Sequence, residues 1–201
     1  MKENNEKCKL QLFGGREIPI DIIKTDPPNF DLVDIDGKQK KIVKEGNDWR
    51  AASLTQVLEE GIFELNSEFN NTNENYLAIG IVKDSYVIPA QNPGSNPSLE
   101  NIAIFTGSDW SSPIFCKGNG KEDNPRIKNN QKIKLKYDSN EGTLILFIDG
   151  VQQPAYITGI KEKVRFIIVL YTSGSSCTIH SLKKLKAPTS QHIANEIAIQ
   201  W

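Results

Sequence analysis

Residues that could carry acid–base or nucleophilic chemistry are few and widely spaced in this sequence. Its two histidines, His180 and His192, stand in no pattern that supplies the positioned partner that general base catalysis needs. There is no Gly-x-Ser-x-Gly elbow, so a serine hydrolase of that kind is not supported. The densest acidic set lies between positions 59 and 68 and is typical of the solvated face of a strand rather than of a glycosidase pair. We therefore expect no catalytic residues and a protein that is not an enzyme.

The sequence gives no better support for a metal site or a phosphate site than for a catalytic site. The segment 31–37 contains several aspartates before a glycine, as a calcium loop does, but Lys38 and Lys40 occupy positions where further ligands belong. A turn between strands is the better interpretation. The glycine-containing segment 118–121 ends in a lysine without the Walker pattern, which favours a hairpin turn. We expect no metal site and no cofactor.

Length, charge and cysteine usage exclude further classes. The 201 residues suit one domain, and 24 Lys and Arg against 25 Asp and Glu give a net charge of −1, which argues against a nucleic-acid partner. No apolar run approaches the roughly 18 residues of a membrane span, and the polar start lacks a signal sequence. The cysteines Cys8, Cys116 and Cys177 are odd in number and scattered, which indicates a reducing compartment. We expect a cytoplasmic or nuclear protein without membrane attachment.

Hydrophobic residues alternate with polar ones along most of the chain, which predicts strands. Ile133, Leu135 and Tyr137 alternate with lysines, and Cys8, Leu10 and Leu12 alternate near the start. Short apolar runs recur between turn signals such as 27–29, 140–142 and 149–150. Many short strands at close spacing predict an all-β protein, an antiparallel two-sheet β-sandwich.

The C-terminal segment breaks this pattern. After position 188, Ser190 can cap a short helix on which Ile193, Ile197 and Trp201 follow one another at helical spacing. We expect a β-sandwich domain over 1–187 and a helical tail over 188–201. Because isolated helices of this length are marginal in water, the stripe must dock on its own sandwich, on a second copy in self-association, or on a partner.

Four segments of the chain resemble the SPRY domain family. The strongest is 133–150, where Asp138, Gly142-Thr143-Leu144, Phe147 and Asp149-Gly150 stand at the family's strand and turn positions. The other segments are 59–69 and 78–83 upstream and 164–171 downstream, followed by a last strand near 177–182. The resemblance covers about 49–187 and implies a SPRY/concanavalin-like jelly-roll sandwich, with Trp110 in its core.

The resemblance also implies a function. SPRY domains are non-catalytic adaptor or scaffold modules that recognise a peptide or protein surface through loops at one end of the sandwich. The residues that it places in those loops, and that we expect to bind the partner, are Trp49, Arg50, Tyr86, Tyr171, Thr172, Ser173 and Ser175. Trp and Arg are enriched in binding hot spots, and the alternative for Trp49 and Tyr171 is packing into the core.

A carbohydrate-binding, lectin-like module is the alternative on the same kind of sandwich. The Asn-rich composition, with Trp and Tyr expected at the surface, favours it. The lack of a signal sequence and of a convincing calcium loop argues against it.

Overall fold

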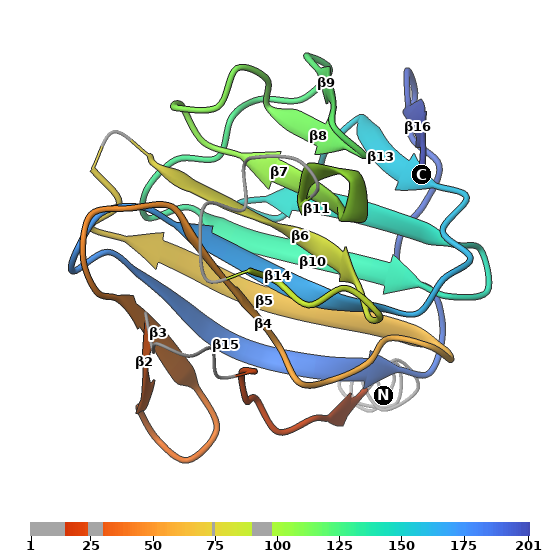
Figure 1. The fold of residues 1–201 in the computed structure, drawn as a ribbon. Helices are drawn as coiled ribbons and strands as arrows, with labels where there is room; N and C mark the ends of the chain where they lie inside the picture. The colour runs from red at the N-terminus through yellow and green to blue at the C-terminus, as the bar shows by residue number, and fades with distance from the viewer. Residues whose placement is uncertain (1–14, 24–29, 74, 90–97) are drawn as a thin grey trace, which may run out of the picture.

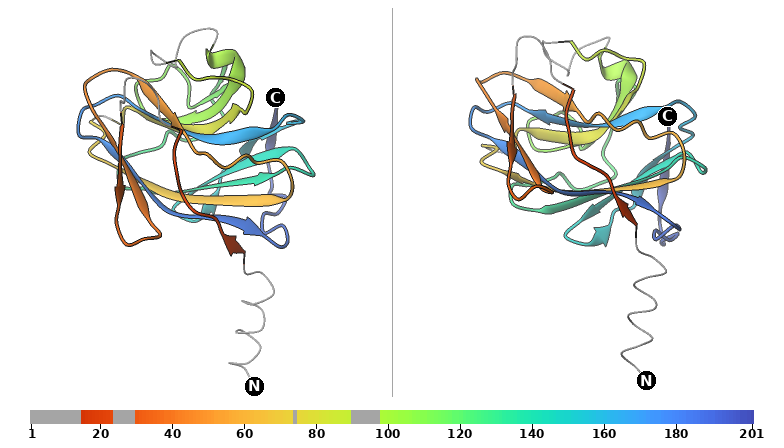
Figure 2. Two further views of the ribbon diagram at one scale, coloured as in Figure 1. Left: turned by 60° about the horizontal axis from the view of Figure 1, so that its bottom comes forward. Right: turned by 90° about the horizontal axis from the view of Figure 1, so that it is seen from below.

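The computed structural model describes residues 15–23, 30–73, 75–89 and 98–201 as two packed β-sheets (Figures 1 and 2). The described residues contain sixteen strands, one short 3-10 helix and no α-helix, which confirms the predicted all-β sandwich. The elements are β1 (Arg16–Glu17), β2 (Phe30–Asp34), β3 (Lys40–Lys44), β4 (Arg50–Ser53), β5 (Ile62–Asn70), β6 (Leu77–Lys83), η1 (Ser98–Asn101), β7 (Ile102–Thr106), β8 (Ile114–Cys116), β9 (Asn119–Lys121), β10 (Lys132–Asp138), β11 (Thr143–Ile148), β12 (Val151–Gln152), β13 (Ala155–Thr158), β14 (Val164–Leu170), β15 (Ser176–Leu185) and β16 (Ile197–Gln200).

The larger sheet has ten strands, and its main path runs β16-β13-β11-β10-β5-β15-β3-β2. At its centre lies the β10–β11 hairpin that the sequence predicted. Asp138 Oδ1 accepts a hydrogen bond from the backbone N–H of Asn140 at 2.9 Å, and Gly142 has a φ of 63°. Asp149 and Gly150, with φ of 50° and 83°, form the two-residue turn between the paired residues Ile148 and Val151.

The smaller sheet has six strands in the order β4-β14-β6-β7-β8-β9. Its two longest strands, β6 and β14, pair antiparallel over their whole length, from Val164 opposite Lys83 to Leu170 opposite Leu77. Both strands are buried on both faces, whereas β5 alternates between buried and half-buried residues from Phe63 onward. The smaller sheet is therefore covered on its outer as well as its inner face.

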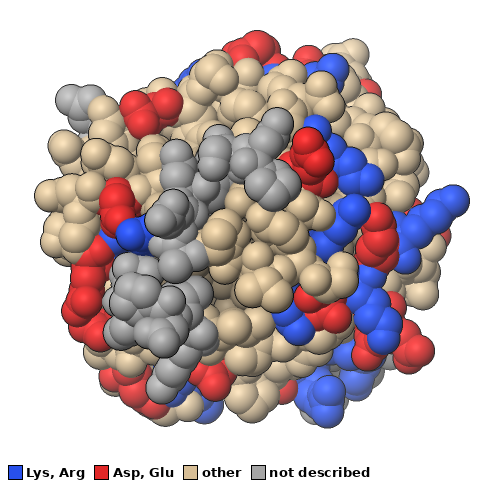
Figure 3. Space-filling view, viewed as in Figure 1, with Lys and Arg blue, Asp and Glu red and all other residues tan. Residues whose placement is uncertain are grey.

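Two hydrophobic clusters account for this burial. The main core lies between the sheets and includes Leu65, Ile79 and Phe166. The second cluster lies on the outer face of the smaller sheet, where partly buried side chains pack over it. Those covering side chains are Trp49, Tyr86, Ile88, Leu99 and Trp110. Figure 3, in the same view as Figure 1, shows uncharged side chains over much of the middle of this face.

The predicted C-terminal helix is wrong. Residues 197–200 form β16, which pairs parallel with β13, and the backbone N–H of Trp201 donates to Thr158 O at 2.8 Å. The segment fits two periodicities equally. Strand spacing relates Ile197, Ile199 and Trp201, and helical spacing relates Ile193, Ile197 and Trp201. Because β13 offers an open edge of backbone donors and acceptors, the strand is the conformation that gains partners.

Because the tail is a strand, it also packs differently from the apolar helical stripe that the sequence predicted. Trp201 is 8% exposed, whereas Ile197 is 40% exposed, so the predicted stripe is not buried as a whole. The Trp201 indole N–H donates to Glu162 Oε2 at 2.5 Å, and Lys117 Nζ lies 5.0 Å from its ring. Trp201 therefore packs on its own sandwich.

Two local expectations fall on residues that the structure does not describe, the alternation of Cys8, Leu10 and Leu12 and the turn at 27–29. In the part of the chain that it does describe, no helix is long and apolar enough to cross a membrane.

Candidate functional site

Four aromatic side chains converge at the end of the sandwich where β14 ends and β6 begins. Trp49 lies with its ring centroid 5.2 Å from that of Trp110 and 5.3 Å from that of Tyr171. Tyr76 lies 5.6 Å from Tyr171 and 6.2 Å from Trp49. All four are half-buried, so each ring has one part against its neighbours and one part in solvent. We call Trp49, Tyr76, Trp110 and Tyr171 the aromatic surface.

The register of the smaller sheet brings these rings together. Leu170 at the end of β14 pairs with Arg50 on one side and with Leu77 on the other. Trp49 and Tyr76 directly precede those two partners, and Tyr171 directly follows Leu170. The three rings are therefore neighbours across three adjacent strands, although the chain separates them widely. Trp110 reaches them from the loop between β7 and β8 and rests on Phe115 at 5.5 Å.

The loop that carries Trp49 is held by a buried lysine and by hydrogen bonds to the neighbouring loop. Lys44, whose side chain is fully buried, donates to Gly46 O at 3.0 Å and to Asp48 Oδ1 at 2.8 Å. The Asp48 backbone N–H donates to Tyr171 O at 3.1 Å. The Ser173 N–H donates to Asn47 Oδ1 at 2.8 Å. The loops 45–50 and 171–175 are therefore held to each other.

The loop that carries Trp110 has its own clamp. The Arg126 guanidinium donates to the carbonyl oxygens of Gly107 at 2.9 Å, Trp110 at 2.6 Å and Ser111 at 3.1 Å. A planar, permanently charged fork suits three carbonyls of one loop better than a flexible ammonium would. The aromatic surface is therefore built on ordered loops.

The predicted site residues divide into two groups. Trp49 and Tyr171 belong to the aromatic surface, and Arg50 is at its rim, where it forms an ion pair with Asp48. Thr172 and Ser173 follow Tyr171 and are half-buried and exposed, respectively. Sequence reasoning therefore located two of the four rings and the adjoining loop.

Ser175 and Tyr86 are not part of the aromatic surface. Ser175 is fully buried, and its hydroxyl donates to Thr172 O at 2.5 Å within its own turn. Tyr86 lies beyond the far end of β6, a strand of seven residues and about 20 Å that starts at Leu77. Its hydroxyl lies 3.0 Å from Ser98 Oγ, and the structure does not bring it to the aromatic surface.

Tyr76 and Trp110 were missed as surface residues. Trp110 was expected in the core, but it is half-buried and packs over the second hydrophobic cluster. The available signal was its polar company, with Asp109 before it and two serines after it. Tyr76 follows an Asn-rich turn and precedes a buried run, which by itself indicates only the start of a strand.

The described nucleophiles and ligating side chains do not assemble into a reactive centre. Burial raises the pKa of the Cys116 thiol to about 11 and raises the pKa of the Cys177 thiol further, so both are protonated at neutral pH. Among the described residues, no three His, Cys, Asp or Glu side chains are grouped so as to hold a metal ion. His180 is exposed and hydrogen-bonded to Gln39 at 2.6 Å.

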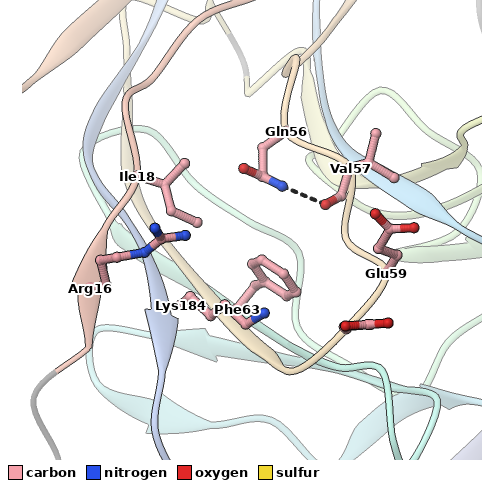
Figure 4. Close-up of a pocket in the computed structure, with 8 residues that line it drawn as sticks. Arg16, Ile18, Gln56, Val57, Glu59, Phe63 and Lys184 are labelled. Carbon is pink, nitrogen blue, oxygen red and sulfur yellow. Dashed lines mark hydrogen bonds between the residues drawn. The ribbon is translucent and has the colours of Figure 1, made fainter.

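A small cavity of about 130 Å³ lies away from the aromatic surface, between β1, the 56–60 segment and β5 (Figure 4). Figure 4 shows Arg16 and Lys184 on one side of Phe63 and Glu59 on the other. Ligand pockets usually enclose about 300 to 1,000 Å³, so this cavity is small for an organic ligand. Glu59 is moreover engaged by Lys163 at 2.5 Å.

Comparison with known proteins identifies the fold. No family model matches the sequence, and no curated protein matches it. Solved SPRY domains match the structure. The SPRY domain of human HERC1 has a TM-score of 0.56 at 9% identity, with 79% of this chain and 99% of that chain covered. The TRIM65 PSpry domain has a TM-score of 0.60 at 12% identity, covering 87% of this chain and 94% of that chain. The chain therefore has a divergent SPRY-like fold, as the resemblance implied.

Proposed function

We propose that this protein is a non-catalytic recognition module, an adaptor or scaffold that binds a peptide or protein surface through the aromatic surface. The observation that carries the proposal is the convergence of four half-exposed Trp and Tyr rings on loops at one end of the sandwich. Trp, Tyr and Arg dominate binding hot spots, and aromatic residues clustered at a surface mark interaction sites. The SPRY-like fold supports the proposal by analogy only.

The chemistry of this surface suits a protein partner. Trp and Tyr present large apolar faces together with a polar N–H or O–H, and they lose little conformational entropy when they are bound. Arg50 and Asp48 at the rim add charge complementarity around the aromatic centre. The clamps by Lys44 and Arg126 hold the loops in place before binding, which lowers the entropic cost of association.

We place this activity inside the cell, in the cytoplasm or the nucleus. The two described cysteines, Cys116 and Cys177, are free thiols, which supports a reducing compartment.

The test is an affinity pull-down from the source cell's lysate, read by mass spectrometry. Wild type is compared with a Trp49→Ala/Tyr171→Ala double variant and with Tyr86→Ala, a half-buried tyrosine away from the aromatic surface. Thermal unfolding of all three proteins checks that they are folded. We expect one stoichiometric protein to bind wild type and Tyr86→Ala and to be lost with the double variant.

The affinity of the captured protein is then measured by calorimetry. Two hot-spot truncations should weaken it by at least about 30-fold. Equal binding by wild type and the double variant would remove the aromatic surface as the site. Specific signals on a glycan array, without any stoichiometric protein, would favour the lectin-like alternative instead.

A further inference from the structure

A groove of about 340 Å³ lies on the outer face of the larger sheet, far from the aromatic surface. Its floor is formed by outward-facing residues of β11 and β13, and its wall by the segment 188–196 that leads to β16. The groove adjoins the β10–β11 turn, at the Ile62 end of β5. The aromatic surface lies beyond the Asn70 end, about 27 Å of strand away.

The strand alternation of β11 and β13 builds this floor. Thr143 and Ile145 on β11 and Tyr156 and Thr158 on β13 line the groove, whereas the intervening Leu144 and Ile157 are fully buried in the core. Thr143, Tyr156 and Thr158 therefore bring side chains that carry hydroxyl groups to the groove. Those hydroxyls make no hydrogen bond to another residue in the described ranges.

The wall is fixed to the sheet by specific contacts. Gln152 Nε2 donates to Gln191 O at 2.8 Å, and His192 Nδ1 is hydrogen-bonded to Glu196 Oε1 at 2.6 Å. The Ile193 N–H donates to Glu196 Oε2 at 3.3 Å. The pairing of β16 with β13 then anchors the far end of the segment. These contacts hold both the wall and the floor of the groove in place.

The charged residues that line the groove are predominantly acidic. Three acidic residues, Asp138, Glu141 and Glu196, line the groove, and no Lys or Arg is among the described residues that line it. The hydrogen bond from His192 holds the pKa of Glu196 below its ordinary value, so this carboxylate is ionised at neutral pH. Lys136, on the adjoining strand β10, is engaged with Glu64 at 3.7 Å and with Thr189.

The arrangement of these carboxylates favours an organic cation over a metal ion. They line the groove without forming any group of three ligating side chains among the described residues. Ile145, Pro188 and the ring of Tyr156 supply apolar surface in the same groove. An alkyl chain can pack on such surface while its cationic head contacts carboxylate oxygens or the face of the tyrosine ring. The volume also lies within the usual range for small-ligand sites.

We propose that this groove binds a guanidinium or ammonium group carried on an alkyl chain. Two sources share that chemistry, an arginine or lysine side chain of a peptide and a free polyamine.

The experiment titrates the full chain with Nα-acetyl-arginine N-methylamide, its uncharged citrulline counterpart and spermidine, by calorimetry and by ¹H–¹⁵N NMR. We expect the arginine compound to bind, the citrulline compound to bind at least about fivefold more weakly, and shifts at Gln152, Tyr156 and Gln191. Tighter binding of spermidine than of the arginine compound would identify a free polyamine, and the reverse order would identify a side chain.

Two variants test the site without touching the core. Glu141→Gln removes one exposed carboxylate and should weaken binding about fivefold, whereas Glu45→Gln, the same change beside the aromatic surface, should have no effect. Thr143→Lys places an ammonium in the groove and should abolish binding. Equal affinity for the arginine and citrulline compounds, shifts that map elsewhere, unchanged binding by either groove variant, or no binding at about 10 mM would each overturn the proposal.

Discussion

The buried ammonium of Lys44 makes the loop below Trp49 unusually sensitive to the charge of Asp48. The Lys44 side chain is 0% exposed, and its three donors go to the carbonyls of Glu45 and Gly46 and to Asp48 Oδ1. The side chain of Asp48 is 44% exposed, so only one member of the pair is fully removed from water. We expect the two partners to respond differently to substitution.

Asp48→Asn should destabilise the protein by about 1 to 3 kcal/mol. Breaking a fully buried ion pair costs about 3 to 5 kcal/mol, and losing an exposed one costs about 0.2 to 1 kcal/mol. The half-exposed Asp48 lies between these limits. Lys44→Met, in contrast, leaves no buried charge and keeps most of the packing of the side-chain stem. Water can reach the carbonyls of the exposed residues Glu45 and Gly46, so the variant should stay within about 1 kcal/mol of wild type.

The assay is a double-mutant cycle, with urea unfolding followed by tryptophan fluorescence. In the Lys44→Met background, Asp48→Asn should cost at most about 1 kcal/mol, because only the ion pair with Arg50 is then lost. The resulting coupling energy is about 1 to 2 kcal/mol. The same cost of Asp48→Asn in both backgrounds, or a larger loss from Lys44→Met than from Asp48→Asn, would refute the reasoning.

Two further predictions concern a turn and the C-terminal strand. Gly142→Ala should lower the free energy of unfolding by at least about 1 kcal/mol more than Gly150→Ala, measured in urea. Both residues have positive φ, but a Cβ at 142 meets Ile160 O at 2.5 Å and one at 150 meets nothing within 4 Å; similar costs would contradict this. Burial opposes ionisation of Glu162, but hydrogen bonds, chiefly from the Trp201 indole, outweigh it and lower the pKa below the ordinary 4.5. A lowered folded-state pKa gives stability that is present above pH 4.5 and lost as pH falls through the folded value, so amide protection in β16 should fall in acid. Glu162→Gln should abolish that pH dependence, and unchanged protection in acidified wild type would contradict it.

Local sequence determined most of the strands and the central hairpin. Alternation along 133–137 and the turn chemistry of Asp138, Gly142 and Asp149-Gly150 predict β10, β11 and their turns, which the structure confirms. These features depend on side-chain alternation and on backbone conformations set within a few residues. The order of such segments was also enough to indicate the SPRY-like fold.

The aromatic surface depended on tertiary structure. Trp49 and Tyr171 were predicted only by resemblance, and nothing local distinguishes Tyr76 from the first residue of an ordinary strand. Only the register that places Leu170 between Arg50 and Leu77 sets these rings side by side. The burial of Lys44 likewise follows from the loops that close around it, because a lone lysine in a strand pattern predicts an exposed side chain.

The C-terminal segment shows most directly that periodicity in the sequence does not always determine secondary structure. Its sequence satisfies helical spacing through Ile193, Ile197 and Trp201, and strand spacing through Ile197, Ile199 and Trp201. Helix and strand can both satisfy the backbone hydrogen bonds of so short a segment, so periodicity alone does not choose between them. The open edge of β13 and the position of Glu162 favour the strand, because pairing there satisfies backbone groups and buries the indole in one step.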